Sequence, residues 1–209
     1  MKTKVIVIFF LSLALAACAS NKTTTFYLLR SMEPTNQELE KNKSQLKVIN
    51  ILVNPIKLPE YLDRPQMVLR ESEYKLQLSE YHRWAEPLKD DFTRVFVKDL
   101  NSRIAPSNAV VYSNLNGAKV NNQLSIEVLR MDVNTENQVV LKVKWVLLSE
   151  KGTVTIEKQN TEYNVPINDK SHESGVEAQS KAIALFADHV AKTIRSYQHE
   201  NDQVKSSLH

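Results

Sequence analysis

The chain has 209 residues, of which 42% are hydrophobic and 24% are charged, and its formal net charge is +3 at pH 7. These proportions are typical of one globular domain of ordinary size, and the near-neutral balance excludes the basic surface that nucleic-acid binding requires. The chain has only three glycines, which argues against a glycine-rich phosphate-binding loop.

The first 17 residues have the layout of a secretory signal peptide. Lys2 and Lys4 precede an apolar run at 5–17 that only Ser12 interrupts. A membrane-spanning helix needs about 20 apolar residues, so this run is short for a permanent anchor. Because small residues end the run, as they do at a cleavage site, we expect residues 1–17 to be removed.

The single cysteine of the chain, Cys18, closes the run Leu15-Ala16-Ala17-Cys18. This run is similar to the lipobox of bacterial lipoproteins, in which the thiol takes a diacylglyceryl group as a thioether. The alternative, an ordinary signal peptide followed by a chance cysteine, requires the one cysteine to fall here by accident. We therefore predict that Cys18 carries acyl chains such as palmitate, and two or three such chains anchor a protein stably in a membrane.

The residue after the cysteine bears on which membrane holds the protein. In lipoproteins of this kind an aspartate at that position usually retains the protein in the inner membrane, and this chain has Ala19 instead. An alanine at this position favours the outer membrane, with the domain facing the periplasm. With its only thiol acylated, the mature chain has to fold without disulfides.

Most of the chain after residue 25 shows the short alternating segments of a sheet. The exceptions in the first half are a polar segment at 31–45, which we expect to be a loop, and a helical turn at 58–62. In the segment 122–133 the apolar phase switches at Val128-Leu129, which predicts either a β-bulge or a strand with both faces covered. Strands are predicted at 26–29, 46–53, 66–70, 74–78, 109–112, 122–133, 139–148, 153–158 and 161–167.

Two segments have helical periodicity. The first begins at Pro87, carries Asp90 and Asp91 in its first turn, where they suit the helix dipole, and is expected to end near Ile104. The second begins with a capping-box pattern at 174–177 and is expected to end near residue 198. One apolar face of the first comprises Leu88, Phe92, Val95, Phe96 and Leu100, and one stripe of the second comprises Val176, Ile183, Phe186, Ala187, Val190, Ile194 and Tyr197.

These elements predict an α/β fold of the mixed α+β kind. A long antiparallel meander at 122–158 excludes an all-parallel sheet, so we expect one mixed, largely antiparallel sheet packed by two long helices. We divide the chain into a signal peptide (1–17), a lipidated tether (18–25), a single periplasmic domain (26–199) and a polar C-terminal tail (200–209).

Three segments carry a resemblance to a known family. They are Phe26-Tyr27-Leu28-Leu29 soon after the cysteine, the run from Leu58 to Val68, and the run Arg83-Trp84-Ala85-Glu86-Pro87-Leu88. Together with Val53 and Pro55 they are similar to the ABC-type transport auxiliary lipoproteins, over about residues 18–195. The segments 31–45 and 113–121 depart from the family pattern, and neither falls on the matched runs.

The resemblance implies a fold and a role. The fold resembles the amino-terminal domain of the translocation protein TolB. The role is that of a non-enzymatic outer-membrane subunit of an intermembrane phospholipid transport system. Such a subunit docks a mammalian-cell-entry domain protein, which builds a tunnel across the periplasm. The family has no assigned catalytic residue, so the resemblance implies none.

Aromatic and arginine side chains are the usual hot spots of protein interfaces. On that basis we select two candidate docking patches. Trp84 has a second interpretation, in which it closes the core over the start of the helix, and burial statistics favour it. Trp145 lies on an apolar strand face and is expected in the core. The first patch is Tyr61, Leu62, Arg64 and Met67, and the second is Tyr81 and Trp84.

The sequence shows no clear catalytic or metal-binding pattern. The pair Asp188-His189 could form a dyad, but a solvated helix face explains it more simply. Asp90 and Asp91 could hold a cation, yet the helix dipole explains them too. None of Ser72, Ser79 and Ser125 has the context of a nucleophile elbow. We therefore predict no catalytic residue, no metal and no cofactor.

Three functions remain to be separated. The first is the docking subunit of a phospholipid transport system, and a version that binds phospholipid itself would need an apolar cavity between helix and sheet. The second is a structural or envelope-assembly lipoprotein without a role in lipid transport. The third is a periplasmic hydrolase, which would need a polar cleft with a nucleophile and a base.

Overall fold

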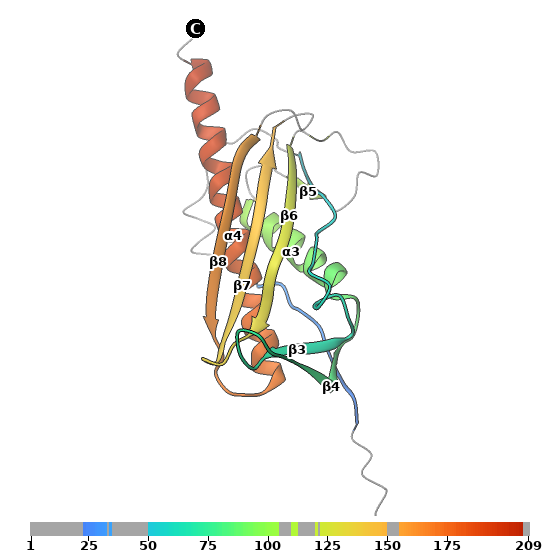
Figure 1. Ribbon diagram of the computed structural model, residues 1–209. Coiled ribbons are helices and arrows are strands. Elements are labelled where there is room, and N and C mark those ends of the chain that lie inside the picture. Colours follow the sequence, from blue (N-terminus) through green and yellow to red (C-terminus); the bar gives the residue numbers. More distant parts are fainter. Residues whose placement is uncertain are drawn as a thin grey trace, which may run out of the picture.

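Eight strands form one mixed sheet in the computed structural model (Figure 1). The structure describes residues 23–32, 34, 50–104, 110–112, 120, 122–149 and 155–206. Cys18 and the signal-peptide and tether residues up to 22 lie outside them, as does most of the loop expected at 31–45. The strands are β1 (Thr25–Tyr27), β2 (Asn50–Val53), β3 (Gln66–Arg70), β4 (Leu76–Trp84), β5 (Val110–Tyr112), β6 (Asn122–Val133), β7 (Gln138–Leu148) and β8 (Thr155–Pro166).

The three longest strands form an antiparallel ladder, β6-β7-β8. Every second residue of β7 faces the helices and is buried, which is the face that alternation predicted. The predicted bulge in β6 is confirmed, because the register with β7 shifts between Val128 and Arg130. The extra residue, Leu129, is 45% exposed, which explains why the apolar phase changes there.

The other edge of β6 is shared by two strands. β2 pairs with its beginning in parallel, and β3 meets its end through the single pair Leu69 and Val133. β3 and β4 form an antiparallel hairpin, and β1 lies parallel to β4 at the outer edge of the sheet. The sheet is thus mixed, with four short parallel pairings and three longer antiparallel ones.

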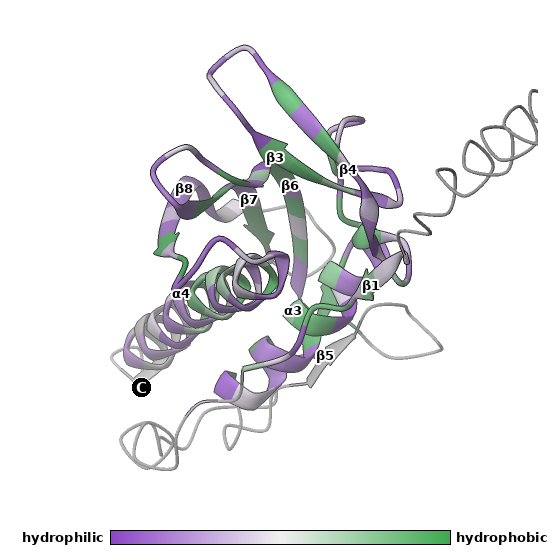
Figure 2. Cartoon of the chain, turned by 90° about the horizontal axis from the view of Figure 1, so that it is seen from below, coloured by the Kyte–Doolittle hydropathy of each residue, from purple (hydrophilic) through white to green (hydrophobic). Residues whose placement is uncertain are grey.

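Both helices, α3 (Leu88–Ile104) and α4 (His172–Ser206), lie on the same face of the sheet (Figures 1 and 2). α3 follows Pro87, whose carbonyl oxygen accepts hydrogen bonds from the N–H groups of Asp90 and Asp91. The predicted bounds of α3 and its apolar face are confirmed, since all five residues of that face are buried.

The predicted bounds of the last helix were wrong at both ends. Ser171, not Ser174, caps it, because the Ser171 hydroxyl oxygen accepts a hydrogen bond of 3.1 Å from the Ser174 N–H. The Ser174 hydroxyl instead accepts from Asn168 N–H, at 2.9 Å, in the preceding loop. At the other end the helix continues to Ser206. The apolar stripe ends near residue 197, whereas the helix runs on beyond the ends of the long strands (Figure 1).

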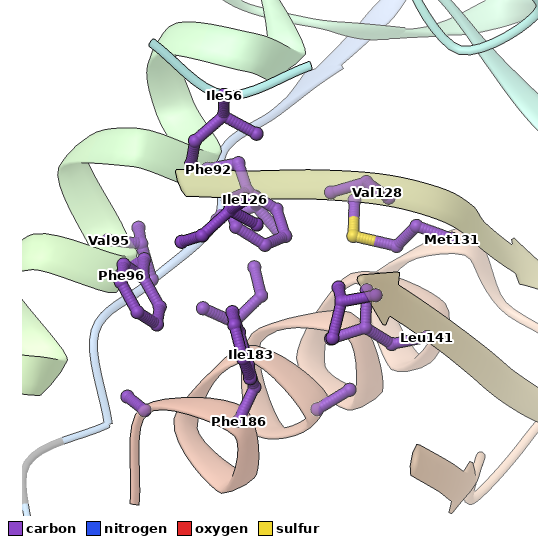
Figure 3. Packing of buried hydrophobic residues seen from close by; sticks show 14 of the residues in the cluster. Ile56, Phe92, Val95, Phe96, Ile126, Val128, Met131, Leu141, Ile183 and Phe186 are labelled. Carbon is purple, nitrogen blue, oxygen red and sulfur yellow. The ribbon is translucent and has the colours of Figure 1, made fainter. Parts of the chain in front are cut away.

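The core lies between the helices and the sheet (Figure 3). Aromatic rings of both helices meet there, with the Phe96 and Phe186 ring centroids 4.9 Å apart. Trp145 of β7, which is fully buried, approaches Phe186 edge-on at 6.3 Å. Side chains from both layers fill this space, and the predicted fold of one mixed sheet under two helices is confirmed.

Candidate partner-docking site

The three sequence segments that carry the family resemblance meet in space. The Trp84 N–H donates a hydrogen bond of 2.8 Å to the Pro65 carbonyl oxygen, which joins the end of β4 to the turn before β3. The next residue, Ala85, donates through its N–H to the Tyr27 carbonyl oxygen at 2.9 Å. The segments 26–29, 58–68 and 83–88, of which the first and last are more than 50 residues apart, therefore build one surface at the β1-β4 edge of the sheet.

The turn at 59–65 is held by local bonds and by one buried side chain. The N–H groups of Leu62 and Asp63 donate to the carbonyl oxygens of Pro59 and Glu60, at 2.9 and 3.2 Å. This i to i+3 pattern is the helical turn that the sequence predicted. Leu62 is only 3% exposed and fixes the turn to the core.

A surface hollow of about 390 Å³ separates this turn from the start of α3. Arg64 lies in its wall, and the Nε atom of that residue is buried with no hydrogen-bond partner among the described residues. A buried donor without a partner is costly, so a movement of the Arg64 side chain that brings its guanidinium to an outside acceptor would be favoured. The residues that line the hollow are Asp63, Arg64, Pro65, Trp84, Ala85, Glu86 and Pro87.

A second group of polar side chains lies on the other side of the turn. Asp132 of β6 is fully buried and accepts hydrogen bonds from Arg70, Arg130 and the Tyr61 hydroxyl. The Arg70 contacts are at 3.1 and 2.9 Å and use two nitrogens, as in a forked ion pair. Burial, followed by the charge of Asp132, raises the pKa of Tyr61 to about 12. These bonds hold the Tyr61 hydroxyl within the fold.

The structure places the six candidate docking residues at one edge but exposes them unequally. Leu62 and Met67 are each 3% exposed and Trp84 is 6% exposed, so their side chains pack in the core and cannot form a contact surface. For Trp84 this agrees with the interpretation that burial statistics favoured. Tyr81 is 44% exposed, and Tyr61 and Arg64 are half-buried. A docking role for these three remains a prediction.

Two carboxylates whose role the sequence did not reveal hold the N-terminal segment onto α3. Asp91 accepts a hydrogen bond of 2.7 Å from the Leu29 N–H, and Asp99 accepts bonds from the Ser31 hydroxyl and the Met32 N–H, at 2.7 and 2.9 Å. Both aspartates are fully buried. Burial raises the pKa of each carboxyl, to about 6 for Asp91. The signal was present in the sequence, because both fall on the apolar face of the helix at helical spacing.

The same edge contains two stacked imidazoles. The rings of His82 on β4 and His172 at the start of α4 are parallel within 4°, with centroids 3.6 Å apart. His82 Nδ1 is 2.9 Å from the Tyr27 hydroxyl, and His172 Nε2 is 2.9 Å from the Ser79 hydroxyl. Burial, and then the proximity of His82, lowers the pKa of His172. The stack therefore joins β1, β4 and α4 most favourably when His172 is uncharged.

The possible dyad in α4 does not form. His189 Nδ1 is 2.9 Å from the Tyr163 hydroxyl, and its ring meets Trp145 edge-on. Asp188 instead pairs with Lys192 at 2.6 Å. The expectation that both residues lie on a solvated face was wrong for His189, which packs against the sheet. Among the residues that the structure describes, no group of three or more acidic, His or Cys side chains is arranged to hold a metal ion.

A family model described as "ABC-type transport auxiliary lipoprotein component" matches residues 27–191. The chain belongs to this family. The matched residues of this transport auxiliary lipoprotein include those that line the hollow, the two carboxylates of α3 and most of α4. It begins nine residues after Cys18. None of the helices in the described part of the protein is long and apolar enough to cross a membrane.

Two solved structures share the fold of this transport auxiliary lipoprotein. An uncharacterised protein matches with a TM-score of 0.68 and 19% identity, covering 82% of this chain and 99% of its own. A protein from Xanthomonas campestris, of the family DUF330, matches with a TM-score of 0.67 and 15% identity, covering 85% and 99%. At such identities the likeness concerns the fold alone. The sequence has no match among curated proteins.

Proposed function

We propose that this protein is a non-enzymatic lipoprotein subunit of an intermembrane phospholipid transport system. In this proposal acyl chains on Cys18 hold it in the outer membrane, and its domain faces the periplasm and docks a mammalian-cell-entry domain tunnel protein. The observation that carries the proposal is the family match over residues 27–191, which makes the chain an auxiliary component of a transporter. The run Leu15-Ala16-Ala17-Cys18 supports the anchor.

The hollow beside Arg64 is the proposed docking point. Its walls combine rigid proline-bounded backbone with an arginine whose Nε lacks a partner among the described residues. A carbonyl or carboxylate oxygen of the tunnel protein would supply the acceptor, while the exposed ring of Tyr81 would add apolar contact area. Preformed pockets of this kind let a partner bind without a large ordering cost.

Capture of the tunnel protein from native membranes tests the docking proposal. We expect the tagged lipoprotein to retain it, and the Arg64→Ala and Tyr81→Ala variants to lose roughly thirtyfold in affinity, which corresponds to about 2 kcal/mol at a hot spot. Lys192→Ala is the matched control, because Lys192 is an exposed cation (67%) on α4. Absence of any complex with the parental chain would count against docking and favour an envelope-assembly role. Equal capture by all variants would place docking on another surface.

Labelling with palmitate tests the anchor separately. We expect label on the parental protein, none on Cys18→Ser, and loss of that variant from the membrane fraction. Mass spectrometry of the mature protein should show a chain that starts at residue 18 and carries acyl groups. A free thiol, or a start at another residue, would contradict the anchor whatever the capture experiment shows.

A further inference from the structure

Exposed hydrophobic side chains concentrate at the outer edge of the sheet. Of the six large hydrophobic residues that are exposed in the described part of the chain, three lie on or beside β1. They are Phe26, Leu28 and Tyr81, with exposed fractions of 62%, 47% and 44%. Scattered apolar residues need no explanation, but a group of three at one edge indicates a contact surface.

Strand geometry directs these side chains outward together. Phe26 and Leu28 are two residues apart and exposed, while Tyr27 and Leu29 between and after them turn inward, Leu29 to 2% exposure. The register of β1 with β4 pairs Phe26 with Arg83, and Tyr81 lies two residues before Arg83. We name this group, Phe26, Leu28, Tyr81 and Arg83, the β1 surface.

The length of chain before β1 limits what can cover this surface. Six residues lie between Cys18 and Thr25, and even a fully extended chain from one to the other spans only about 25 Å. The domain is much longer, because the 35 residues of α4 alone span about 52 Å. In Figure 1 the N-terminal strand lies toward the lower end of the molecule and the C-terminus at the upper end. A short tether to a bilayer therefore brings β1 close to that bilayer and keeps the far end of α4 away.

The segment that follows β1 is fixed to the rest of the domain. Residues 29–32 are bonded through their backbone and Ser31 to Asp91 and Asp99 of α3, and the Arg30 N–H donates to the Ser180 hydroxyl of α4 at 3.1 Å. Because this segment is bonded to both helices, the tether joins the folded domain at β1, beside the β1 surface.

The composition of the β1 surface fits the interfacial region of a bilayer. Aromatic side chains concentrate at the headgroup level of membranes, and an arginine keeps its charge in the polar layer while its stem lies along apolar groups. We propose that the β1 surface lies in the interfacial region of the bilayer that holds the acyl chains of Cys18. This inference rests on the lipidation in the proposed function. It shares Tyr81 with the proposed docking contact, so its test uses only positions 26 and 28 of the β1 surface.

Single-cysteine labelling of the mature lipoprotein tests this contact. Because the native cysteine carries lipid in the proposal, Phe26→Cys or Leu28→Cys introduces the only free thiol for an environment-sensitive nitrobenzoxadiazole dye. The labelled full-length protein is placed in vesicles of phosphatidylethanolamine and phosphatidylglycerol that contain a headgroup-region spin label. Leu185→Cys is the matched control, since Leu185 is 43% exposed and lies about 20 Å along α4 from His172.

We expect dye at positions 26 and 28 to emit at least threefold more strongly on protein in vesicles than on the same protein in buffer without vesicles or detergent, where β1 is exposed. The spin label should quench this emission. Dye at position 185 should show neither effect. Equal responses at 26, 28 and 185 on protein that floats with the vesicles would overturn the membrane contact alone. A response at 26 and 28 that appears only when the tunnel protein is added would overturn it in favour of a protein contact. Protein that does not float and has two free thiols would overturn both this inference and the lipidation.

Discussion

Asp91 is a buried carboxyl whose ionisation depends on two opposing influences. Burial raises its pKa to about 6, from an ordinary value of 3.8, while the Leu29 N–H and the Arg94 guanidinium favour the charged form. The folded protein therefore keeps a proton that the unfolded chain has lost between these two values. The stabilising effect of this proton is complete below about pH 3.8 and is lost as the pH rises through about 6.

Asp91→Asn removes this titration, so we expect the difference in unfolding free energy between parent and variant to change over that window. As the pH rises over that window, the unfolding free energy of the parent should decrease relative to that of the variant by up to about 3 kcal/mol. Urea denaturation between pH 4 and 7 measures it. If the two stability curves run parallel over this range, Asp91 does not titrate there.

His172 gives the opposite dependence on pH. Burial, and then the neighbouring His82, lowers its pKa in the folded protein, so the unfolded chain takes up a proton first as the pH falls. Stability is complete above the ordinary value of 6.5 and decreases as the pH falls from there through the folded pKa. His172→Gln keeps a hydrogen-bonding group for the Ser79 hydroxyl and should lose this decrease. His199→Gln, on the exposed end of α4, should retain it. An unchanged acid limb in His172→Gln would show that the stacked pair is not the cause.

At the scale of elements, α3 holds the segment that leads to the membrane anchor. Asp99 accepts two hydrogen bonds from residues 31 and 32 and lies 3.6 Å from the Arg103 guanidinium. Asp99→Ala leaves all three donors without this acceptor, so we expect a loss of about 3 kcal/mol in unfolding free energy. We also expect faster hydrogen exchange at the Met32 amide. The control Asp90→Ala, one position from Asp91 but exposed, should change neither the stability nor this exchange by much. Unaltered exchange at Met32 would mean that the segment is held by other contacts.

Local sequence patterns predicted the elements that are buried on one side only. The buried face of β7, the face and bounds of α3 and the bulge of β6 each follow from the spacing of apolar residues, because burial on one side imposes that spacing. The second half of β4 was missed, since its register with β3 shifts between Gln66 and Met67 and alternation is lost there. The end of α4 was missed because its last residues, from 198 to 206, are mostly polar and continue the helix without an apolar stripe.

The candidate site was predicted only in part, for a related reason. Its position at 58–68 and 83–88 followed from a resemblance, but which side chains are exposed depends on how distant segments meet. Leu62 and Trp84 have the composition of interface residues and are buried because the turn and β4 close on each other through the bond between Trp84 and Pro65. Asp132 gives no sequence signal, since its three partners come from the turn, from β3 and from its own strand.

At the scale of the whole molecule, the sheet has two parts joined by few backbone pairings. The long ladder β6-β7-β8, with β2 and β5 beside it, is one, and the strands β1, β4 and β3 at the outer edge are the other. Figure 1 shows β3 and β4 lying across the lower end of the long strands. Only Leu69 and Val133 are paired between β3 and β6. The bonds of Asp132 to Arg70 and Tyr61 are therefore a main connection between the proposed docking edge and the ladder.

Asp132→Ala tests whether this carboxylate couples the two parts. It leaves Arg70, whose side chain is 17% exposed, without its anion, and breaking such a buried pair costs roughly 3–5 kcal/mol. We expect the amides of β3 and of the turn at 59–65 to exchange with solvent faster, while those of β7 and β8 change only as far as global stability does. The isosteric Asp132→Asn keeps an acceptor, so its amide exchange rates should lie between those of the parent and those of Asp132→Ala. Uniform acceleration across all strands would show instead that the sheet unfolds as one unit and that the docking edge has no separate freedom.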